Sequence, residues 1–176
     1  MHKQYAALTA SPFVPGTGFT RPVQIFPERV TPEDPAVNVM TDLKKVSVVN
    51  VRARSSVDKA NAKMIRYGVR SLLVLDEDDK VIGILTAVDV LGEKPVNFLK
   101  NMGGTHADIL VRDIMTPQRE LDVLLLEDVH AAKVGNIVAT LEKSGRQHAL
   151  VVENNAEGQA ICGLFSATQI ARLLAA

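Results

Sequence analysis

The chain has 176 residues, of which 47% are hydrophobic, enough for one compact unit or for two small repeats with a shared core. Twenty basic and twenty acidic side chains cancel, and a net charge of zero argues against nucleic acid or an anionic membrane as a partner. No signal peptide or apolar run of about 18 residues occurs, so we expect a soluble, cytoplasmic protein. Cys162 lies in an apolar run, where a buried, unreactive thiol is expected.

Proline dominates the beginning of the chain. Residues 1–35 contain six of the eight prolines, which predicts an extended N-terminal arm rather than a helix or a central strand. Such an arm either packs across its own domain or a partner, or stays loosely attached to the surface. The sequence leaves both possibilities open.

A regular pattern of strands and helices begins at residue 36. For the first repeat, residues 36–93, we predict a strand (46–51), a helix (57–67), two strands (71–75 and 81–85) and a short helix (87–91). Ser55 or Ser56 is expected to cap the first helix and Gly68 to end it.

A short connector separates this repeat from a second one. Residues 94–108 are expected to hold a helix over 95–102 that Gly103 and Gly104 close. For the second repeat, residues 109–176, we predict a strand (121–126), a helix (129–143), two strands (148–152 and 160–165) and a final helix (167–174).

Short motifs recur in the two repeats. Asn38-Val39-Met40-Thr41 is matched by Asp113-Ile114-Met115-Thr116, and Gly83-Ile84-Leu85-Thr86 by Gly163-Leu164-Phe165-Ser166. A duplicated unit of this size cannot bury both faces of its sheet alone. We therefore predict an α/β (α+β) fold in which two βαββα repeats pack as a pseudo-twofold pair.

These motifs and their order resemble the CBS domain family, named after cystathionine β-synthase, over residues 36–176. The resemblance implies a stand-alone tandem CBS pair, or Bateman module. In that family the cleft between paired repeats binds AMP, ADP, ATP or S-adenosylmethionine as a regulatory ligand, with no obligatory cofactor. It also implies a homodimer formed through helix faces, and a signal passed to an effector protein that the sequence does not identify.

The ligand signature of the family is Gly-h-x-Thr/Ser-x-x-Asp, where h is hydrophobic, and Gly83 to Asp89 satisfy it in full. Thr86 stands where a strand gives way to a helix, so its hydroxyl and the free amides of the first turn can donate to a phosphate. Asp89 can accept hydrogen bonds from both hydroxyls of a ribose. The same two residues also suit a helix cap that binds no ligand.

The second repeat departs from this signature. Ser166 keeps the hydroxyl, but Gln169 carries an amide where the signature has a carboxylate. An amide still forms hydrogen bonds with a sugar, yet it lacks the ionic acceptor that makes such bonds strong. We therefore expect one good site that uses Asp89 and one weak, altered or empty site that uses Gln169.

Arg70 and His148 head the middle strands at places that we interpret as equivalent, and the resemblance implies that both face the cleft and contact phosphate. The guanidinium of Arg70 is always charged, whereas His148 would be charged only near or below about pH 6.5. A surface ion pair of Arg70 with the acidic turn 76–79 and a purely structural role for His148 are the alternatives.

Met40 and Met115 are each followed by threonine, Thr41 and Thr116. By resemblance this segment walls the pocket of the adenine base, and methionine adapts well to a flat ring. Packing in the core is the other explanation of these residues.

The sequence carries no catalytic pattern. Its four histidines are scattered, and no HExxH, GxSxG, P-loop or CxxC arrangement occurs, so we assign no catalytic residue and no metal site. The predicted function is a regulatory module that senses an adenosine-type ligand between its repeats. The alternative is a ligand-free dimerisation or scaffold module.

Overall fold

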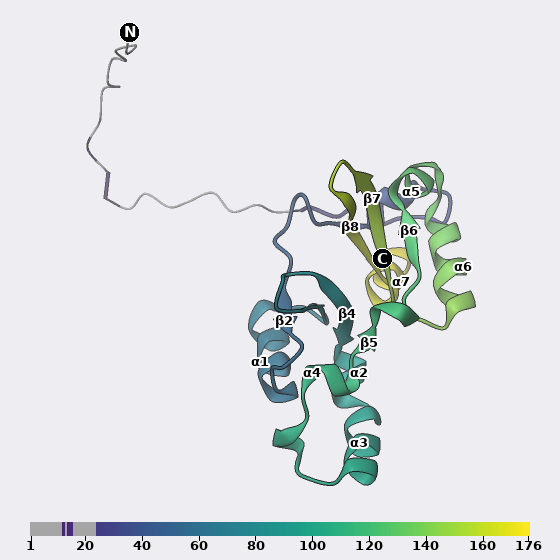
Figure 1. Ribbon diagram of the computed structural model, residues 1–176. Coiled ribbons are helices and arrows are strands. Elements are labelled where there is room, and N and C mark those ends of the chain that lie inside the picture. Colours follow the sequence, from purple (N-terminus) through teal and green to yellow (C-terminus); the bar gives the residue numbers. More distant parts are fainter. Residues whose placement is uncertain (1–11, 13, 16–23) are drawn as a thin grey trace.

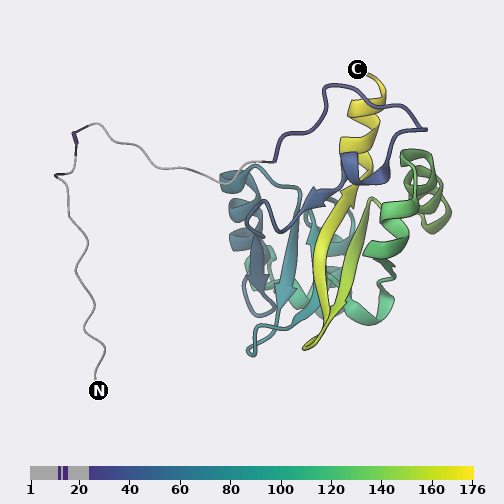
Figure 2. The same ribbon diagram turned by 90° about the horizontal axis from the view of Figure 1, so that it is seen from above.

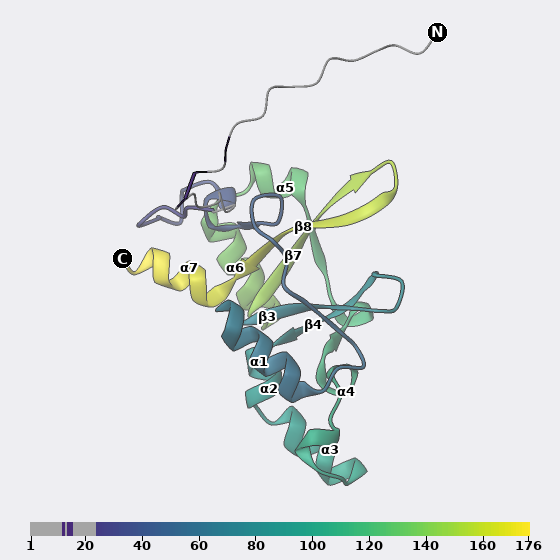
Figure 3. The ribbon, with the colours of Figure 1, turned by 90° about the vertical axis from the view of Figure 1, so that its left-hand side faces the viewer.

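The computed structural model describes residues 12, 14, 15 and 24–176. This part has the predicted α+β architecture, and its strands form two four-stranded β-sheets, one in each half (Figure 1, Figure 3). Figure 1 shows the two halves one above the other, the first in blue to teal and the second in green to yellow. Of the predicted arm, residues 1–11, 13 and 16–23 lie outside the described residues.

The first half follows the predicted order of elements. It contains β2 (Asn50–Arg52), α1 (Val57–Tyr67), β3 (Ser71–Leu75), β4 (Val81–Thr86) and α2 (Ala87–Leu91). β2 pairs with β3 in parallel, and β3 pairs with β4 antiparallel. The strand predicted over 46–51 was placed too early: β2 begins only at Asn50, because residues 43–49 cross from one sheet to the other.

The second half contains β6 (Val123–Leu125), α5 (Leu126–Ala131), α6 (Val134–Ser144), β7 (His148–Asn155), β8 (Gly158–Ser166) and α7 (Ala167–Leu174). The single helix predicted over 129–143 was wrong, because two helices occupy this stretch. Lys133 is extended (φ −103°, ψ 162°) and bridges to Pro35, and the amide of Ala36 donates to the carbonyl of Ala132 at 2.9 Å. The N-terminal segment thus takes the backbone groups that a continuous helix would need.

Both ends of α1 lie where the sequence predicts them, and the equivalent helix α6 ends one residue after its predicted bound. α1 and α6 have 11 residues each. Ser56 caps α1 by accepting a hydrogen bond from the amide of Lys59. Gly68 (φ 63°) and Gly145 (φ 66°) end the two helices in the left-handed conformation, which glycine adopts without strain.

The connecting segments exchange between the halves. β1 (Thr41–Asp42) follows η1 (Ala36–Val39) and pairs with β8 of the second half. β5 (Thr116–Pro117) pairs with β4 of the first half. The remaining connecting elements are α3 (Lys94–Met102), η2 (His106–Asp108), α4 (Val111–Ile114) and η3 (Gln118–Glu120). Each sheet therefore takes an edge strand from the segment that opens the other repeat.

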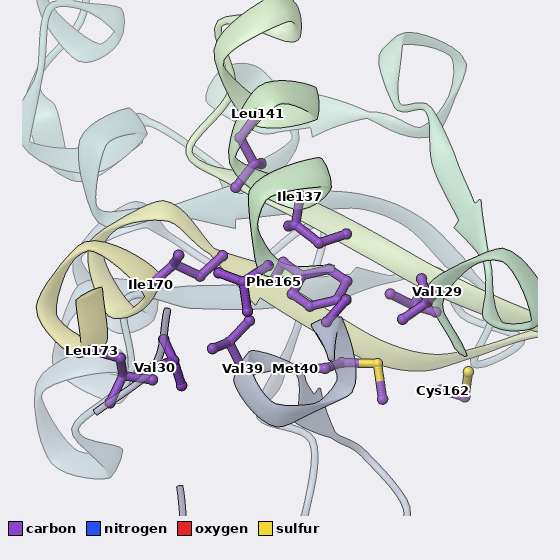
Figure 4. Close-up of a cluster of buried hydrophobic side chains, with 13 residues drawn as sticks. Val30, Val39, Met40, Val129, Ile137, Leu141, Cys162, Phe165, Ile170 and Leu173 are labelled. Atoms are coloured by element: carbon purple, nitrogen blue, oxygen red, sulfur yellow. The ribbon is translucent and has the colours of Figure 1, made fainter. Parts of the chain in front are cut away.

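The two hydrophobic cores follow the same exchange. Phe165 lies at the centre of the second core (Figure 4), where Val39 and Met40 from the N-terminal segment pack with it. The first core contains Ile109 and Val111, which follow the connector. The spatial grouping therefore differs from the domain boundaries that we predicted along the chain.

The described part of the N-terminal arm lies against the second half. Val30 is buried in the second core, and its amide donates to the carbonyl of Leu173 in α7 at 3.0 Å. Figure 2 shows this segment, in dark blue, passing beside α7. Residues 24–35 thus pack against the chain's own second half, which is one of the two possibilities that the sequence left open for the arm.

Two glycines allow the methionines to approach the sheets. A Cβ at Gly83 would lie 2.5 Å from the backbone oxygen of Thr116 and 3.1 Å from the sulfur of Met115. A Cβ at Gly163 would lie 2.5 Å from the sulfur of Met40. Here the glycine that leads each signature strand has a packing role.

We expect Gly83→Ala to lower the stability of the fold by about 1–3 kcal/mol, because the backbone of β5 must move to admit the methyl group. Gly163→Ala is the matched control and should cost less, because the flexible end of Met40 can turn aside. Thermal unfolding of the two variants measures the difference. Equal losses would contradict this explanation of the close contact.

Candidate functional site

A cavity of about 650 Å³ lies between the two halves. The end of α1 and the start of β3 form one wall, the start of α7 and the neighbouring strands form another, and residues 43–49 cross between them. Its lining residues are Thr41, Leu43, Val46, Ser47, Val48, Val49, Tyr67, Gly68, Val69, Arg70, Ser71, Leu73, His148, Leu150, Leu164, Ser166, Thr168, Gln169 and Arg172. This volume is within the usual range of small-molecule sites.

The cavity gathers half of the residues that the sequence predicts for the site. Those that line it are Thr41, Arg70, His148, Ser166 and Gln169. Those that do not are Met40, Thr86, Asp89, Met115 and Thr116. The cavity thus lies beside the signature that has the amide, and the signature with the carboxylate lies outside it.

The polar groups of Thr86 and Asp89 are bonded to each other. Asp89 Oδ2 accepts from the amide and from the hydroxyl of Thr86, both at 2.8 Å, and Thr86 Oγ1 accepts from the amide of Asp89 at 3.2 Å. The other carboxylate oxygen, Oδ1, pairs with Lys94 Nζ at 2.6 Å, and this ammonium also donates to the carbonyl of Ile114 at 3.0 Å. The buried carboxylate of Asp89 therefore closes the start of α2 and holds the connector helix α3.

The corresponding positions in the second half are open. Ser166 stands before α7 but forms no side-chain cap. Within the described part of the chain, Gln169 Nε2 is buried without a hydrogen-bond partner. Buried amides normally have a hydrogen-bond partner. Because this one has none, it is available to a molecule in the cavity.

The segment that joins the first two strands is longer in the first half than in the second, and the longer segment is the one beside the cavity. Residues 43–49 join β1 to β2 at the cavity, and residues 118–122, which are two fewer, join β5 to β6 in the other half. Arg146 donates to the carbonyl of Glu120 and so fastens the shorter segment. The place of Arg146 is taken by Val69 in the first half, and Val69 has no side-chain donor.

Arg70 faces the cavity without an acidic partner. The ion pair predicted as an alternative, with the turn 76–79, does not form: Arg52 pairs with Asp79 at 2.5 Å, and Arg54 lies 3.8 Å from Glu77. Among the described residues, Arg70 forms no ion pair and no side-chain hydrogen bond.

The equivalence of Arg70 and His148 was wrong by one residue. Ser71 pairs with Thr86, and His148 pairs with Ser166, so His148 corresponds to Ser71. The amides that begin α2 and α7 donate to the carbonyls of Arg70 and Gln147, both at 2.9 Å. His148 lies as far along the chain from Ser71 as Gly145 lies from Gly68. The extra residues of the second half therefore lie in the hairpin that joins β7 to β8.

His148 is a partly buried residue of the cavity wall, and its Nδ1 atom has no hydrogen-bond partner within the described residues. Burial lowers the pKa of His148 below its ordinary value of 6.5; the positive charge of Arg70 acts in the same direction, and Asp89 opposes it. The imidazole is therefore neutral in the unliganded protein at neutral pH.

Acidification should destabilise the unliganded protein through His148. Because the pKa is lowered in the folded state, the unfolded chain takes up the proton first, and stability is lost as the pH falls below 6.5 toward the folded pKa. Thermal unfolding measured between about pH 7.5 and 5.5 should depend less on pH in His148→Gln than in the wild type. His130→Gln, at an exposed position, is the control. An unchanged pH dependence in His148→Gln would refute this assignment.

Met40 and Met115 are placed by packing. Met40 is buried in the second core and lies over Gly163, and Met115 packs against the first core beside Gly83. Thr116 pairs with Ile84 in the sheet. These positions agree with the explanation by core packing, and only Thr41 of this group reaches the cavity.

Sequence reasoning missed several polar side chains, among them Arg172, Thr168 and Lys94. Arg172 and Thr168 lie one turn apart on α7 and line the cavity. The spacing of three residues between Gln169 and Arg172 could have revealed the arginine, since such residues share a helix face. Lys94 follows the signature of the first repeat by five residues, and no motif pointed to it.

Comparisons with known proteins agree with this architecture. The CBS domain family matches residues 36–95. A conserved protein from Pyrococcus horikoshii is 24% identical, with a TM-score of 0.58, over 81% of this chain and 92% of that chain. CBSX2 of Arabidopsis thaliana in complex with AMP is 21% identical, with a TM-score of 0.54, over 80% and 94%.

A third similar structure is the CBS domain pair of protein MJ0100 in complex with 5′-methylthioadenosine and S-adenosyl-L-methionine. It is 16% identical, with a TM-score of 0.55, over 81% of this chain and 96% of that chain. A search of curated proteins found no match to this sequence. The fold is thus that of a CBS pair. Residues 36–95 match the CBS domain family, and the similar structures share the fold over 80–81% of this chain.

Cys162 is buried, as predicted, and burial raises the pKa of its thiol. None of the described helices combines the length and hydropathy that crossing a bilayer requires.

Proposed function

We propose that this protein is a regulatory module that binds an adenosine-type ligand in the cavity between its two halves. The observation that carries the proposal is the pair of unbonded polar atoms, Gln169 Nε2 and His148 Nδ1, in residues that line one cavity between the CBS repeats. Both atoms belong to the second half, and Arg70 and Ser71 of the first half line the same cavity, so a ligand that bonds to these atoms and also contacts the first half would join the halves. It would favour whichever arrangement it binds more tightly.

The similar structures support the choice of ligand. CBSX2 is in complex with AMP, and the CBS pair of MJ0100 is in complex with two adenosine derivatives. The apolar part of the cavity wall, which includes Leu43, Val46 and Val48, suits a flat base, and Ser166 and Gln169 suit a sugar. We place the ligand beside Gln169 rather than beside Asp89, whose carboxylate is already bonded to Thr86 and Lys94.

A thermal-shift panel tests this proposal. A ligand at a hundred times its dissociation constant stabilises the fold by about 2.7 kcal/mol, which raises the Tm by roughly 5–11 °C in a protein of this size. The panel contains adenosine, AMP, ADP, ATP and S-adenosylmethionine, with GTP and CTP as controls. A shift with adenosine compounds alone is the expected result. If none of them shifts the Tm, the proposed function is wrong.

A role in association rests on a separate observation. Three large apolar side chains of α1 and α2 are exposed, Ile65 (74%), Val88 (59%) and Leu91 (72%). These contacting helices expose an apolar patch of the kind that marks protein interfaces. We propose that the chain forms a homodimer through this face and that a signal passes from it to an effector protein, as the module has no catalytic pattern of its own. Sedimentation of Leu91→Glu, expected to be monomeric where the wild type is dimeric, tests the dimer.

A further inference from the structure

The cavity carries positive charge, although the whole chain is neutral. Among the residues that the structure describes, no aspartate or glutamate lines it, whereas Arg70 and Arg172 both do. The first arginine comes from the first half of the molecule and the second from α7 of the second half. A molecule bound between the halves therefore meets a guanidinium on each side and no carboxylate.

Neither guanidinium is neutralised by the protein. Within the described residues, Arg70 and Arg172 form no ion pair, whereas Arg52, Arg54, Arg112 and Arg119 each have a carboxylate oxygen within 4.0 Å. The charge of Arg70 is felt inside the site, because it contributes to the lowered pKa of His148. Both arginines can therefore form charge-assisted hydrogen bonds with an anion without breaking an existing pair.

The start of α7 adds uncharged donors to this wall. Ser166 leaves the first turn without a side-chain cap, and Thr168 lines the cavity one turn before Arg172. Gln169 Nε2 is a buried donor without a partner in the described part of the chain. In the other half, Asp89 occupies the equivalent first turn and would repel an anion.

We propose that the cavity selects phosphorylated adenosine ligands over uncharged adenosine and over S-adenosylmethionine, and that Arg70 and Arg172 are the residues that determine this choice. The inference rests on the proposed function and narrows it to one class of ligand. Guanidinium groups match phosphate oxygens in a fork geometry. The sulfonium and ammonium groups of S-adenosylmethionine give that molecule a net positive charge, which two unpaired arginines disfavour.

Calorimetric titration of ADP, adenosine and S-adenosylmethionine tests the inference. We use the wild type, Arg70→Gln, Arg172→Gln and the double variant, at low and high NaCl. Arg29→Gln is the control, because it removes the same charge from an exposed residue that does not line the cavity. Circular dichroism confirms that each variant is folded.

We expect the wild type to bind ADP at least tenfold more tightly than adenosine and to bind S-adenosylmethionine most weakly. Each cavity variant should weaken ADP binding by about tenfold, the strength of a charge-assisted hydrogen bond, and leave adenosine binding unchanged. Salt should weaken the binding of ADP but not of adenosine.

Two outcomes would overturn the inference in different ways. If adenosine and S-adenosylmethionine bind as tightly as ADP and the arginine variants behave as the wild type does, the selectivity is wrong and the proposed function stands. If no adenosine compound binds the wild type, the proposed function fails and the inference fails with it.

Discussion

Replacing Gln169 by leucine is expected to weaken the binding of ADP about tenfold without lowering the stability of the unliganded protein. Leucine fills a similar volume but lacks the amide that lines the cavity. In the unliganded protein Nε2 has no partner within the described residues, so its removal breaks no hydrogen bond there. Titration with ADP measures the loss of binding, and thermal unfolding measures the stability.

Gln159→Leu is the matched control for this variant. Gln159 is an exposed glutamine of β8 that does not line the cavity. The variant should bind ADP as the wild type does. If Gln169→Leu also binds ADP normally, the amide makes no contact with the ligand and our placement of the site is wrong.

Asp89→Ala should have the opposite pattern, with a large loss of stability and ADP binding within about twofold of the wild type. Asp89 is 7% exposed, and its carboxylate accepts two hydrogen bonds from Thr86 and pairs with Lys94. Loss of the cap and of these bonds should cost about 2 kcal/mol, which lowers the Tm by about 4–8 °C. The pair with Lys94 adds little to this sum, since the lysine side chain is half exposed.

The chain offers a close control for Asp89. Asp108 accepts the same two hydrogen bonds from Thr105, both at 2.8 Å, but it is exposed and pairs with no lysine of the described part of the chain. Asp108→Ala should therefore lower the Tm less than Asp89→Ala does. If Asp89→Ala abolishes ADP binding and leaves the Tm unchanged, Asp89 is a ligand residue, as the signature suggested, and our account of it is wrong.

Local signals in the sequence were enough for most of the elements. Gly68 ended α1 and Ser56 capped it, because these effects depend on a few neighbouring residues. The break before Val134 could not be predicted in the same way, since it results from contacts with Pro35 and Ala36, which are far away in the sequence.

The exchange of segments between the halves was also hidden. The residues around Thr41 and Thr116 carry no local pattern that predicts the pairing of Thr41 with β8 or of Thr116 with β4. The start of β2 could not be predicted either. The β-branched residues of 46–49 favour a strand, but they form part of the segment that crosses between the halves beside the cavity.

The candidate site was predicted in its composition more than in its arrangement. Arg70, His148, Ser166 and Gln169 do meet at one cavity. The sequence ranked the two signatures by the charge of a single residue, and this ranking could not include Lys94, which pairs with the carboxylate of Asp89. The carboxylate of the complete motif is therefore already bonded within the protein.

A crystal structure of the protein with ADP tests the central claim most directly. We predict one ADP per chain in the cavity, with its sugar beside Gln169 and its phosphates between Arg70 and Arg172, while the pair between Asp89 and Lys94 stays intact. ADP bound to Asp89 instead, with Lys94 displaced and the cavity beside Gln169 empty, would contradict the account.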